Sequence, residues 1–229
     1  MLNKLLGPFR EFGPAGAIYG LDRVLRRIHP RLGLVMYELM AQPVTDKPLL
    51  PAGLAKNLSF RELAVDSAEV AAMAARPEVK ARRFAQGATA LGVFRKDELL
   101  GYIWFCSGQY VEDEVRCVYV MQRPEVAAFD FDLVVMPESR MGLGFAALWH
   151  CANQYLTARG VRTSYSRVTR FNVASRLAHR RLGARRLGTA LFVQAGSLEL
   201  MIASVPPYLS FSVGGNAPPR LVLDALATS

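Results

Sequence analysis

Cysteine and histidine are scarce in this sequence, with three of each among 229 residues. The cysteines, Cys106, Cys117 and Cys151, are widely spaced and odd in number, which argues against a disulfide framework. No histidine stands at a ligand spacing from them, so we expect no structural metal. We expect buried thiols of a reducing compartment and therefore a cytoplasmic protein.

Long apolar runs are also missing. No stretch approaches the ~18 residues of a membrane-spanning helix, and the first residues lack the basic, apolar and small segments of a secretory signal. Low-complexity tracts are absent, and a content of 52% hydrophobic and 21% charged residues is typical of a folded chain.

Acidic residues are outnumbered, 19 against 28 Lys and Arg, which gives a formal net charge of +9. Such a charge favours anionic partners: a phosphorylated ligand, an acidic membrane surface or nucleic acid. Aromatic residues are not interleaved with the basic ones as stacking platforms, so we do not expect a nucleic-acid partner.

Residues 1–57 differ from the rest and are interpreted as an N-terminal extension. A helix that opens at Gly13 and ends at His29 carries an apolar stripe with arginines mostly off it, and a β-rich run (32–40) and a Pro-rich connector follow. We expect the stripe to cover an edge of the main domain, because surface helices with such a stripe usually face a core. The alternative is a basic amphipathic segment in peripheral contact with the inner face of an anionic membrane.

Residues 58–204 have regular periodicity. We predict strands at 58–65, 88–94, 99–106, 115–121, 129–136, 161–168, 185–193 and 197–203, and helices at 66–75, 77–87, after Gly144 and at 172–182. Hairpins interrupted by a few helices predict an α+β domain with a mixed, mostly antiparallel sheet, and the central strand-helix-strand unit requires a parallel pair. Residues 205–229 show no clear period and are interpreted as a tail.

The stretch from 128 to 156 organises the chain. A strand, Phe129–Met136, is followed by a turn with Pro137, Gly142 and Gly144, and then by a helix. Free amides at a helix start, with the positive end of the helix dipole behind them, bind phosphate or pyrophosphate. An ordinary tight turn between a strand and a helix is the alternative.

Three segments in order resemble the GNAT family of acyl-CoA-dependent N-acyltransferases, over residues 58–204. TALGVFRKDELLGYIWF looks like the family's second and third strands. VVMPESRMGLGFAALW is similar to its acyl-CoA loop, and NVASRLAHRRLGA to its Asn-x-x-Ala segment, with Asn172, Ser175 and Gly183 retained.

The resemblance implies a GNAT-like fold and a bound acetyl-CoA or other acyl-CoA. The backbone from Met141 to Ala146 would bind the pyrophosphate, Arg140 would add a charged contact, and splayed strands would expose the backbone at Val135 and Met136 to the pantetheine arm. The implied coenzyme-binding residues are Val135, Met136, Arg140, Met141, Gly142, Leu143, Gly144, Phe145, Ala146, Asn172 and Ser175. The six arginines between 170 and 186 are candidates for the remaining phosphate or form a solvated helix face. The chain departs from the family in the acyl-CoA loop, which has one extra residue and carries Met141 at the usual Gln/Arg position.

Transfer to an amine needs a base for the amine and an acid for the departing thiolate. His179 stands where the family usually has a tyrosine acid, and the alternative is a histidine that faces water or phosphate. Asp130 and Asp132 are base candidates that should share one face of their strand, since alternate residues do; an ion pair with an arginine is the alternative. The run Glu112–Asp113–Glu114 is typical of a solvated loop. His150 is expected to pack, and Tyr165 is a further candidate.

The sequence therefore predicts an acyl-CoA-dependent N-acyltransferase that acetylates a primary amine by direct attack on the thioester. The alternatives are a catalytically degenerate GNAT-fold protein that binds CoA or a regulatory partner, and a longer-chain N-acyltransferase at a membrane surface. The acceptor is a small-molecule or lipid-linked amine, and a homodimer is compatible with the exposed hairpins.

Overall fold

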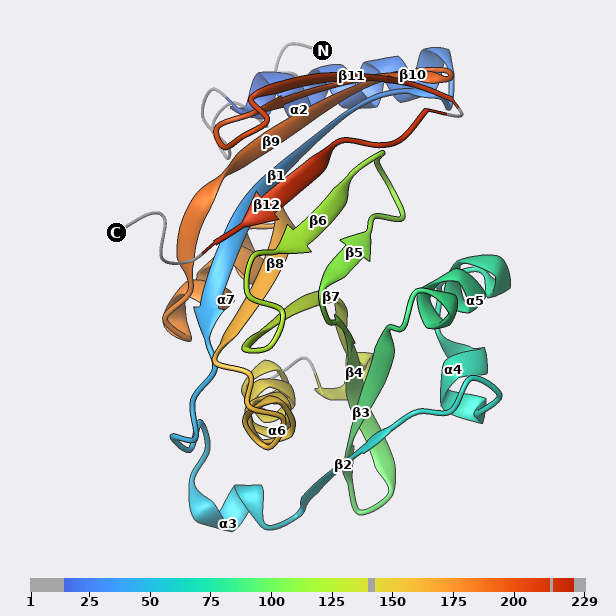
Figure 1. Cartoon of the computed structure of the whole chain (residues 1–229). Helices are drawn as coiled ribbons and strands as arrows, with labels where there is room; N and C mark the ends of the chain where they lie inside the picture. The colour runs from blue at the N-terminus through green and yellow to red at the C-terminus, as the bar shows by residue number, and fades with distance from the viewer. Residues whose placement is uncertain (1–14, 140–142, 215, 225–229) are drawn as a thin grey trace.

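The computed structural model describes residues 15–139, 143–214 and 216–224 and contains a nine-stranded sheet (Figure 1). The strand order is β11-β10-β9-β1-β8-β7-β4-β3-β2, and every neighbouring pair is antiparallel except β7 and β8. Its strands are β1 (Leu32–Pro43), β2 (Leu58–Glu62), β3 (Thr89–Arg95), β4 (Glu98–Cys106), β7 (Ala127–Val135), β8 (Thr163–Thr169), β9 (Arg185–Ala195), β10 (Leu198–Ala203) and β11 (Leu209–Val213). The predicted mixed, mostly antiparallel α+β sheet is confirmed.

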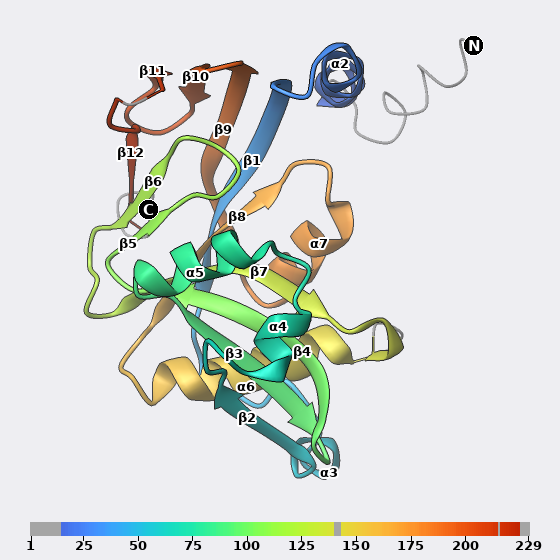
Figure 2. The same cartoon turned by 90° about the vertical axis from the view of Figure 1, so that its right-hand side faces the viewer.

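A second sheet and the helices cover the large one. The second sheet has the order β12-β6-β5, with β5 (Gln109–Val111), β6 (Val118–Met121) and β12 (Arg220–Leu223). The helices are α2 (Ala15–Ile28), α3 (Ala52–Ala55), α4 (Ala68–Ala72), α5 (Pro77–Ala85), α6 (Gly144–Thr157) and α7 (Val173–Arg181), with a 3-10 turn, η1 (Pro137–Ser139). Figure 2 shows α4 and α5 on the face of the sheet opposite to α6.

Helix α6 is apolar around most of its circumference, which predicts a buried helix. Trp149 and Ala152 pack with Leu91 and Ile103 of β3 and β4, and Leu148 packs with Val93. Helix α7 lies on the same side, since the His179 ring is 5.7 Å from the Trp149 ring.

Stacked aromatic rings fill the opposite face. Tyr110 of β5 lies 4.1 Å from Phe131 and 5.0 Å from Phe129 of β7, measured between ring centroids. Tyr119 of β6 lies 4.9 Å from Phe129. The small sheet is thereby joined to the large one through β7.

Strand β1 lies in the middle of the large sheet, although its sequence was assigned to an extension ending at residue 57. It pairs with β9 along Leu32–Ala41 and with β8 along Tyr37–Pro43. Leu39, Met40 and Ala41 are buried, because β8 and β9 flank this part of β1 and other elements pack on both faces of the sheet. A boundary at residue 57 would therefore separate β1 from the sheet to which it belongs.

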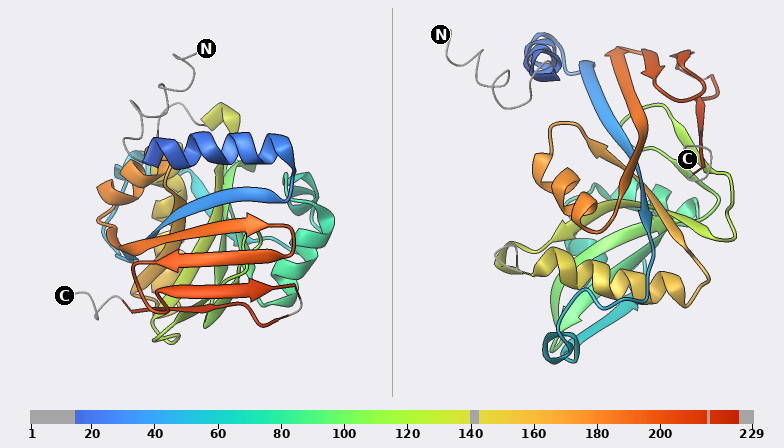
Figure 3. Two further views of the ribbon diagram at one scale, coloured as in Figure 1. Left: turned by 90° about the horizontal axis from the view of Figure 1, so that it is seen from above. Right: turned by 90° about the vertical axis from the view of Figure 1, so that its left-hand side faces the viewer.

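Helix α2 runs alongside β1 at one end of the molecule (Figure 3). The predicted helix is present, but its apolar stripe is not in the core: Leu21 is 50% exposed, Val24 45% and Ile28 69%. Ile18 and Leu25 are half-buried.

Part of the predicted tail is structured. Strand β11 pairs with β10, and β12 pairs in parallel with β6. Both strands have at most five residues, too few for a period to stand out.

A buried ion pair replaces the expected solvated acidic loop. Arg167 of β8 donates to both carboxylate oxygens of Glu112, at 2.7 and 2.8 Å. The amide of Asp113 also donates to Glu112, at 3.0 Å. The Glu112 side chain is inaccessible to solvent, so its charge is balanced inside the protein.

Replacing Glu112 by alanine should therefore destabilise the fold strongly. The change leaves the Arg167 guanidinium buried without its partner, which costs about 3–5 kcal/mol of unfolding free energy. Urea unfolding followed by circular dichroism measures the loss. Glu78→Ala is the matched control, because Glu78 and Arg76 form an ion pair with both side chains exposed, and it should give a much smaller loss. Equal losses of unfolding free energy in the two variants would contradict a larger contribution of the buried Glu112–Arg167 pair.

Candidate active site

The parallel pair β7–β8 opens into a fork. Pairing runs from Ala127 and Thr163 to Asp130 and Ser166 and stops there, although both strands continue. A pocket of about 210 Å³ lies at the opening, between β7, β8 and α7. Its lining includes Asp130, Asp132, Arg167, Asn172, Ser175 and His179.

A β-bulge at Asp132 sets the geometry of β7. Asp132 has a φ of +48°, and the register with β4 shifts between Tyr102 and Trp104. Before the bulge Phe131 faces the aromatic core, and after it Val134 faces that core while Leu133 faces α6. A bulge adds one residue and so reverses the alternation.

The two aspartates consequently lie on opposite faces of β7, and the prediction that they share one face was wrong. Asp132 accepts a hydrogen bond from Arg83 on α5, and Arg83 also contacts Asp113 at 2.8 Å. The alternative, an ion pair with a nearby arginine, is what the structure contains. Asp130 has no such cationic contact among the described side chains.

Asp130 is buried at the base of the fork. Ser164 donates a hydrogen bond to its Oδ1 atom at 2.5 Å. Burial raises the pKa of Asp130 from 3.8 to about 7, and the Ser164 hydrogen bond and the charge of Arg167 oppose that rise. A carboxyl group with this pKa exchanges protons near neutrality, as a general base must.

His179 lines the same pocket from α7 and is 3% exposed. Its Nδ1 atom lies 2.9 Å from Oε1 of Gln42 on β1, and its ring packs edge-on against Phe145 and Trp149. Burial lowers the pKa of His179 from 6.5 to about 4, so the imidazole is neutral at pH 7. The ring is therefore turned away from bulk solvent.

The start of α6 receives no side-chain cap from its N-cap residue, Leu143. Gly144 is required for packing, because a Cβ atom there would lie 2.4 Å from the Ser139 carbonyl oxygen. The predicted coenzyme contacts Arg140, Met141 and Gly142 lie outside the described residues.

The other predicted coenzyme contacts have internal roles that the structure shows. Asn172 caps α7 by accepting a hydrogen bond from the Ser175 amide at 3.0 Å. The Met136 amide donates to the Leu100 carbonyl at 2.9 Å, and Val135 pairs with Gly101. Val135, the last residue of β7, and Met136, the next residue, are therefore both hydrogen-bonded or paired to β4, near the beginning of the loop that leads to α6.

Three of the six candidate phosphate-binding arginines converge on one buried carboxylate. Arg170 and Arg176 donate to Oε1 of Glu38, the latter at 2.8 Å, and Arg180 lies 3.5 Å from Oε2. Glu38 is completely buried in β1. Arg176 thereby ties α7 to the sheet. The alternative of a solvated face describes the rest, since Arg180 is half exposed and Arg181, Arg185 and Arg186 are exposed.

Two other candidates lie away from the chemistry of the fork. His150 is buried in α6, with Nδ1 3.4 Å from the Leu49 amide, which agrees with the expected packing role. Tyr165 belongs to the aromatic core.

Sequence reasoning missed several lining residues, among them Tyr37 and Ser166. Both lie where β1 meets β8, with Tyr37 opposite Thr169 and Ser166 opposite Met40. No local pattern reports that register. The carboxylate of Glu114 accepts a hydrogen bond from the Tyr37 hydroxyl. Its position in the acidic run 112–114 was the one sequence feature that pointed to this residue.

Comparisons with known proteins are informative only at the level of fold. No family model and no curated protein matches the chain. A functionally unknown conserved protein from Staphylococcus epidermidis ATCC 12228 is 11% identical, with a TM-score of 0.50 over 76% of this chain and 65% of that one. A GCN5-related N-acetyltransferase from Kribbella flavida is 16% identical, with a TM-score of 0.43 over 80% and 65%. A tandem GNAT protein from the clavulanic acid biosynthesis pathway is 17% identical, with a TM-score of 0.43 over 67% and 50%.

The match thus spans between half and two thirds of the length of those three structures. With the forked parallel pair and the helix that follows β7, the fold is the GNAT-like one that the three sequence motifs predicted. Within the described ranges, no cluster of three metal-ligating side chains occurs. None of the helices in those ranges has the length and apolar content that crossing a bilayer requires.

The buried, neutral His179 predicts a specific pH dependence of stability. Its folded-state pKa of about 4 lies below the unfolded value of 6.5. The stabilisation is fully present above pH 6.5 and is lost as pH falls towards 4, because the unfolded state then binds the proton first. The loss should reach about 3 kcal/mol at pH 4, at 1.36 kcal/mol per unit of pKa.

Unfolding free energies of wild type and His179→Gln at pH 4–7.5 test this point. The difference between the two should shrink as pH falls. His29→Gln is the control, because His29 is exposed. A difference that is constant with pH would contradict a buried neutral His179.

Proposed function

We propose that this protein is an acyl-CoA-dependent N-acyltransferase that acetylates a primary amine. The observation that carries the proposal is a buried carboxyl group, Asp130, at the base of a fork between parallel strands. The uncapped start of α6 follows one of those strands after a short loop. This arrangement supports the proposal because an anion bound at the helix start and a proton acceptor at Asp130 would lie at the same end of the parallel pair.

The donor would lie between the start of α6 and the fork. A pyrophosphate accepts hydrogen bonds from free helix amides and is favoured by the helix dipole. The amides from Leu143 to Ala146 are the described part of that site, and Arg140, Met141 and Gly142 would complete it by resemblance. Asn172 and Ser175 line the pocket where the acyl end would enter. The acyl-CoA supplies the activated thioester.

The reaction balances with one base. The acceptor reaches the fork as an ammonium group and gives one proton to Asp130. The neutral amine nitrogen then attacks the thioester carbonyl carbon, the carbon–sulfur bond breaks, and the CoA thiolate takes up the second proton that the nitrogen loses as the amide forms. His179, with its low pKa, is not an imidazolium donor at neutral pH, and its proposed contribution is to shape the pocket through Gln42 and Trp149.

Calorimetric titration with acetyl-, butyryl- and octanoyl-CoA tests donor binding and the acyl chain length. We expect micromolar binding of at least one donor and weaker binding of CoA analogues that lack the pyrophosphate. Release of free thiol with a panel of primary amines then tests turnover. Binding without turnover would favour the catalytically degenerate reading, and no binding of any donor would sink the proposal.

Asp130 should control the pH dependence of turnover. Since its pKa is about 7 in the protein without bound amine, log kcat/KM for the amine should rise with pH below 7 and level off above it. Asp130→Asn should lower kcat by about 100-fold or more and remove this inflection.

Ser164→Ala provides the discriminating comparison for that prediction. It removes a hydrogen bond that stabilises the ionised carboxylate, so the inflection should move to higher pH. A purely structural role for Asp130 would leave the position of the inflection unchanged.

A further inference from the structure

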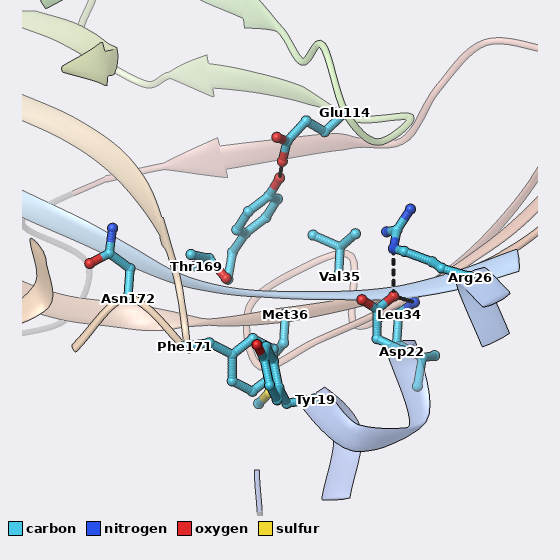
Figure 4. A pocket seen from close by; sticks show the side chains of 11 residues that line it. Tyr19, Asp22, Arg26, Leu34, Val35, Met36, Glu114, Thr169, Phe171 and Asn172 are labelled. Atoms are coloured by element: carbon cyan, nitrogen blue, oxygen red, sulfur yellow. Dashed lines mark hydrogen bonds and ion pairs between the residues drawn. The ribbon is translucent and has the colours of Figure 1, made fainter. Parts of the chain in front are cut away.

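A second pocket adjoins the fork and is built mainly by α2, β1 and the segment after β8 (Figure 4). Its volume is about 520 Å³. Tyr37, Glu114, Thr169 and Asn172 line both this pocket and the fork pocket. Those four side chains therefore form the boundary between the two pockets.

One wall of this pocket is apolar and aromatic. Tyr19 of α2 and Phe171 pack at 5.0 Å between ring centroids, with an interplanar angle of 54°. Leu34 and Met36 of β1 extend the wall, and Figure 4 shows both rings beside Met36. Such a wall takes up an apolar or aromatic group without requiring hydrogen bonds from it.

The charges of the pocket are distributed unevenly. Asp22 is engaged by Arg26 and by the Leu34 amide, both at 2.8 Å, and so attaches α2 to the edge of β1. Glu114 lies instead on the far side of β1, at the boundary with the fork, and is exposed. Its carboxylate accepts a hydrogen bond from the Tyr37 hydroxyl, and among the described residues it forms no ion pair with an arginine or lysine.

We propose that this pocket is the acceptor site and that the acceptor is a primary amine attached to an apolar, preferably aromatic, group. The apolar group lies against Tyr19, Phe171 and Met36, and the ammonium group is attracted to Glu114 and passes Tyr37 into the fork. The inference rests on the proposed transferase function and assigns its substrate class. A carboxylate at the junction favours an ammonium group and disfavours an anionic acceptor.

The sequence of the N-terminal part fits this role. Helix α2 has an exposed apolar stripe, and its described contacts attach it to β1 and to Phe171. Helix α2 thus lines the pocket with Tyr19, Asp22 and Arg26, while Leu21, Val24 and Ile28 of the stripe face solvent.

Binding of 2-phenylethylamine to the full chain in the presence of CoA tests the proposal without turnover. Calorimetry should show binding, and Tyr19→Ala and Phe171→Ala should each weaken it about tenfold. Tyr208→Ala is the matched control, because Tyr208 is 63% exposed elsewhere, and should leave the affinity unchanged. Phe171→Leu, which keeps an apolar side chain, should give an intermediate loss and guards against misfolding of the alanine variant.

The role of Glu114 is tested with a neutral analogue. Glu114→Gln should weaken 2-phenylethylamine about tenfold or more and leave 2-phenylethanol unaffected. Equal effects on the two ligands, or unchanged affinities in the Tyr19 and Phe171 variants, would overturn the acceptor assignment. Failure of 2-phenylethylamine to bind the wild type would overturn it too.

The two proposals fail in different ways. If an acyl-CoA binds and amines are acetylated while the pocket variants behave as wild type, the transferase stands and this acceptor site is wrong. If the pocket variants lose amine binding but no acyl-CoA binds, the pocket is an amine site and the transferase function is wrong.

Discussion

The separation of β7 and β8 is the constraint on which the rest of the site depends. Parallel strands that remained paired past Asp130 and Ser166 would cover the backbone and side chains that line the fork pocket. The bulge at Asp132 accompanies the separation and turns Leu133 towards α6, where it packs against the helix. Because of the same bulge, Asp130 lies on the α6 side of β7, while Asp132 lies on the opposite side and forms an ion pair with Arg83. One backbone irregularity thus places the two carboxylates in different environments.

Buried charges keep the two sides of the fork in place. Arg167 is tied to Glu112 on the side of the small sheet, and Arg176 is tied to Glu38 on the side of α7. Buried ion pairs contribute little net stability, but breaking one is costly, so they fix geometry more than they increase stability. Arg167 lies on β8 directly after the last paired residue, Ser166, and Arg176 lies on α7, so both pairs position elements that bound the fork. An empty groove between two strands needs such support, since apolar packing alone would tend to fill it.

The sequence predicted those features of the fold that depend on local hydrophobic periodicity and on capping or turn residues. The strand and helix on either side of the acyl-CoA loop, the hairpin of β3 and β4, and the cap of α7 at Asn172 follow from spacing and capping residues. The central place of β1 could not be predicted, because its partners lie 120 or more residues away in the chain and pairing is non-local. The bulge at Asp132 could not be predicted, because no glycine marks its position in the sequence. The contacts of the α7 arginines could not be predicted either, because the sequence is the same whether they face water or bind Glu38. The candidate site was therefore predicted as a region, while the faces and partners of its side chains required the sheet.

The two titratable groups at the bottom of the fork respond oppositely to the same environment. Burial favours the neutral form of both, which raises the pKa of Asp130 to about 7 and lowers that of His179 to about 4. Near neutral pH only Asp130 can then change its charge. A cationic amine that approaches past Glu114 would lower the pKa of Asp130, because a nearby positive charge favours the carboxylate. Under the proposed mechanism, arrival of the acceptor would therefore favour the ionised form of Asp130, which is the form that can accept its proton. The burial that disfavours this ion in the absence of ligand makes its formation depend on the bound cation.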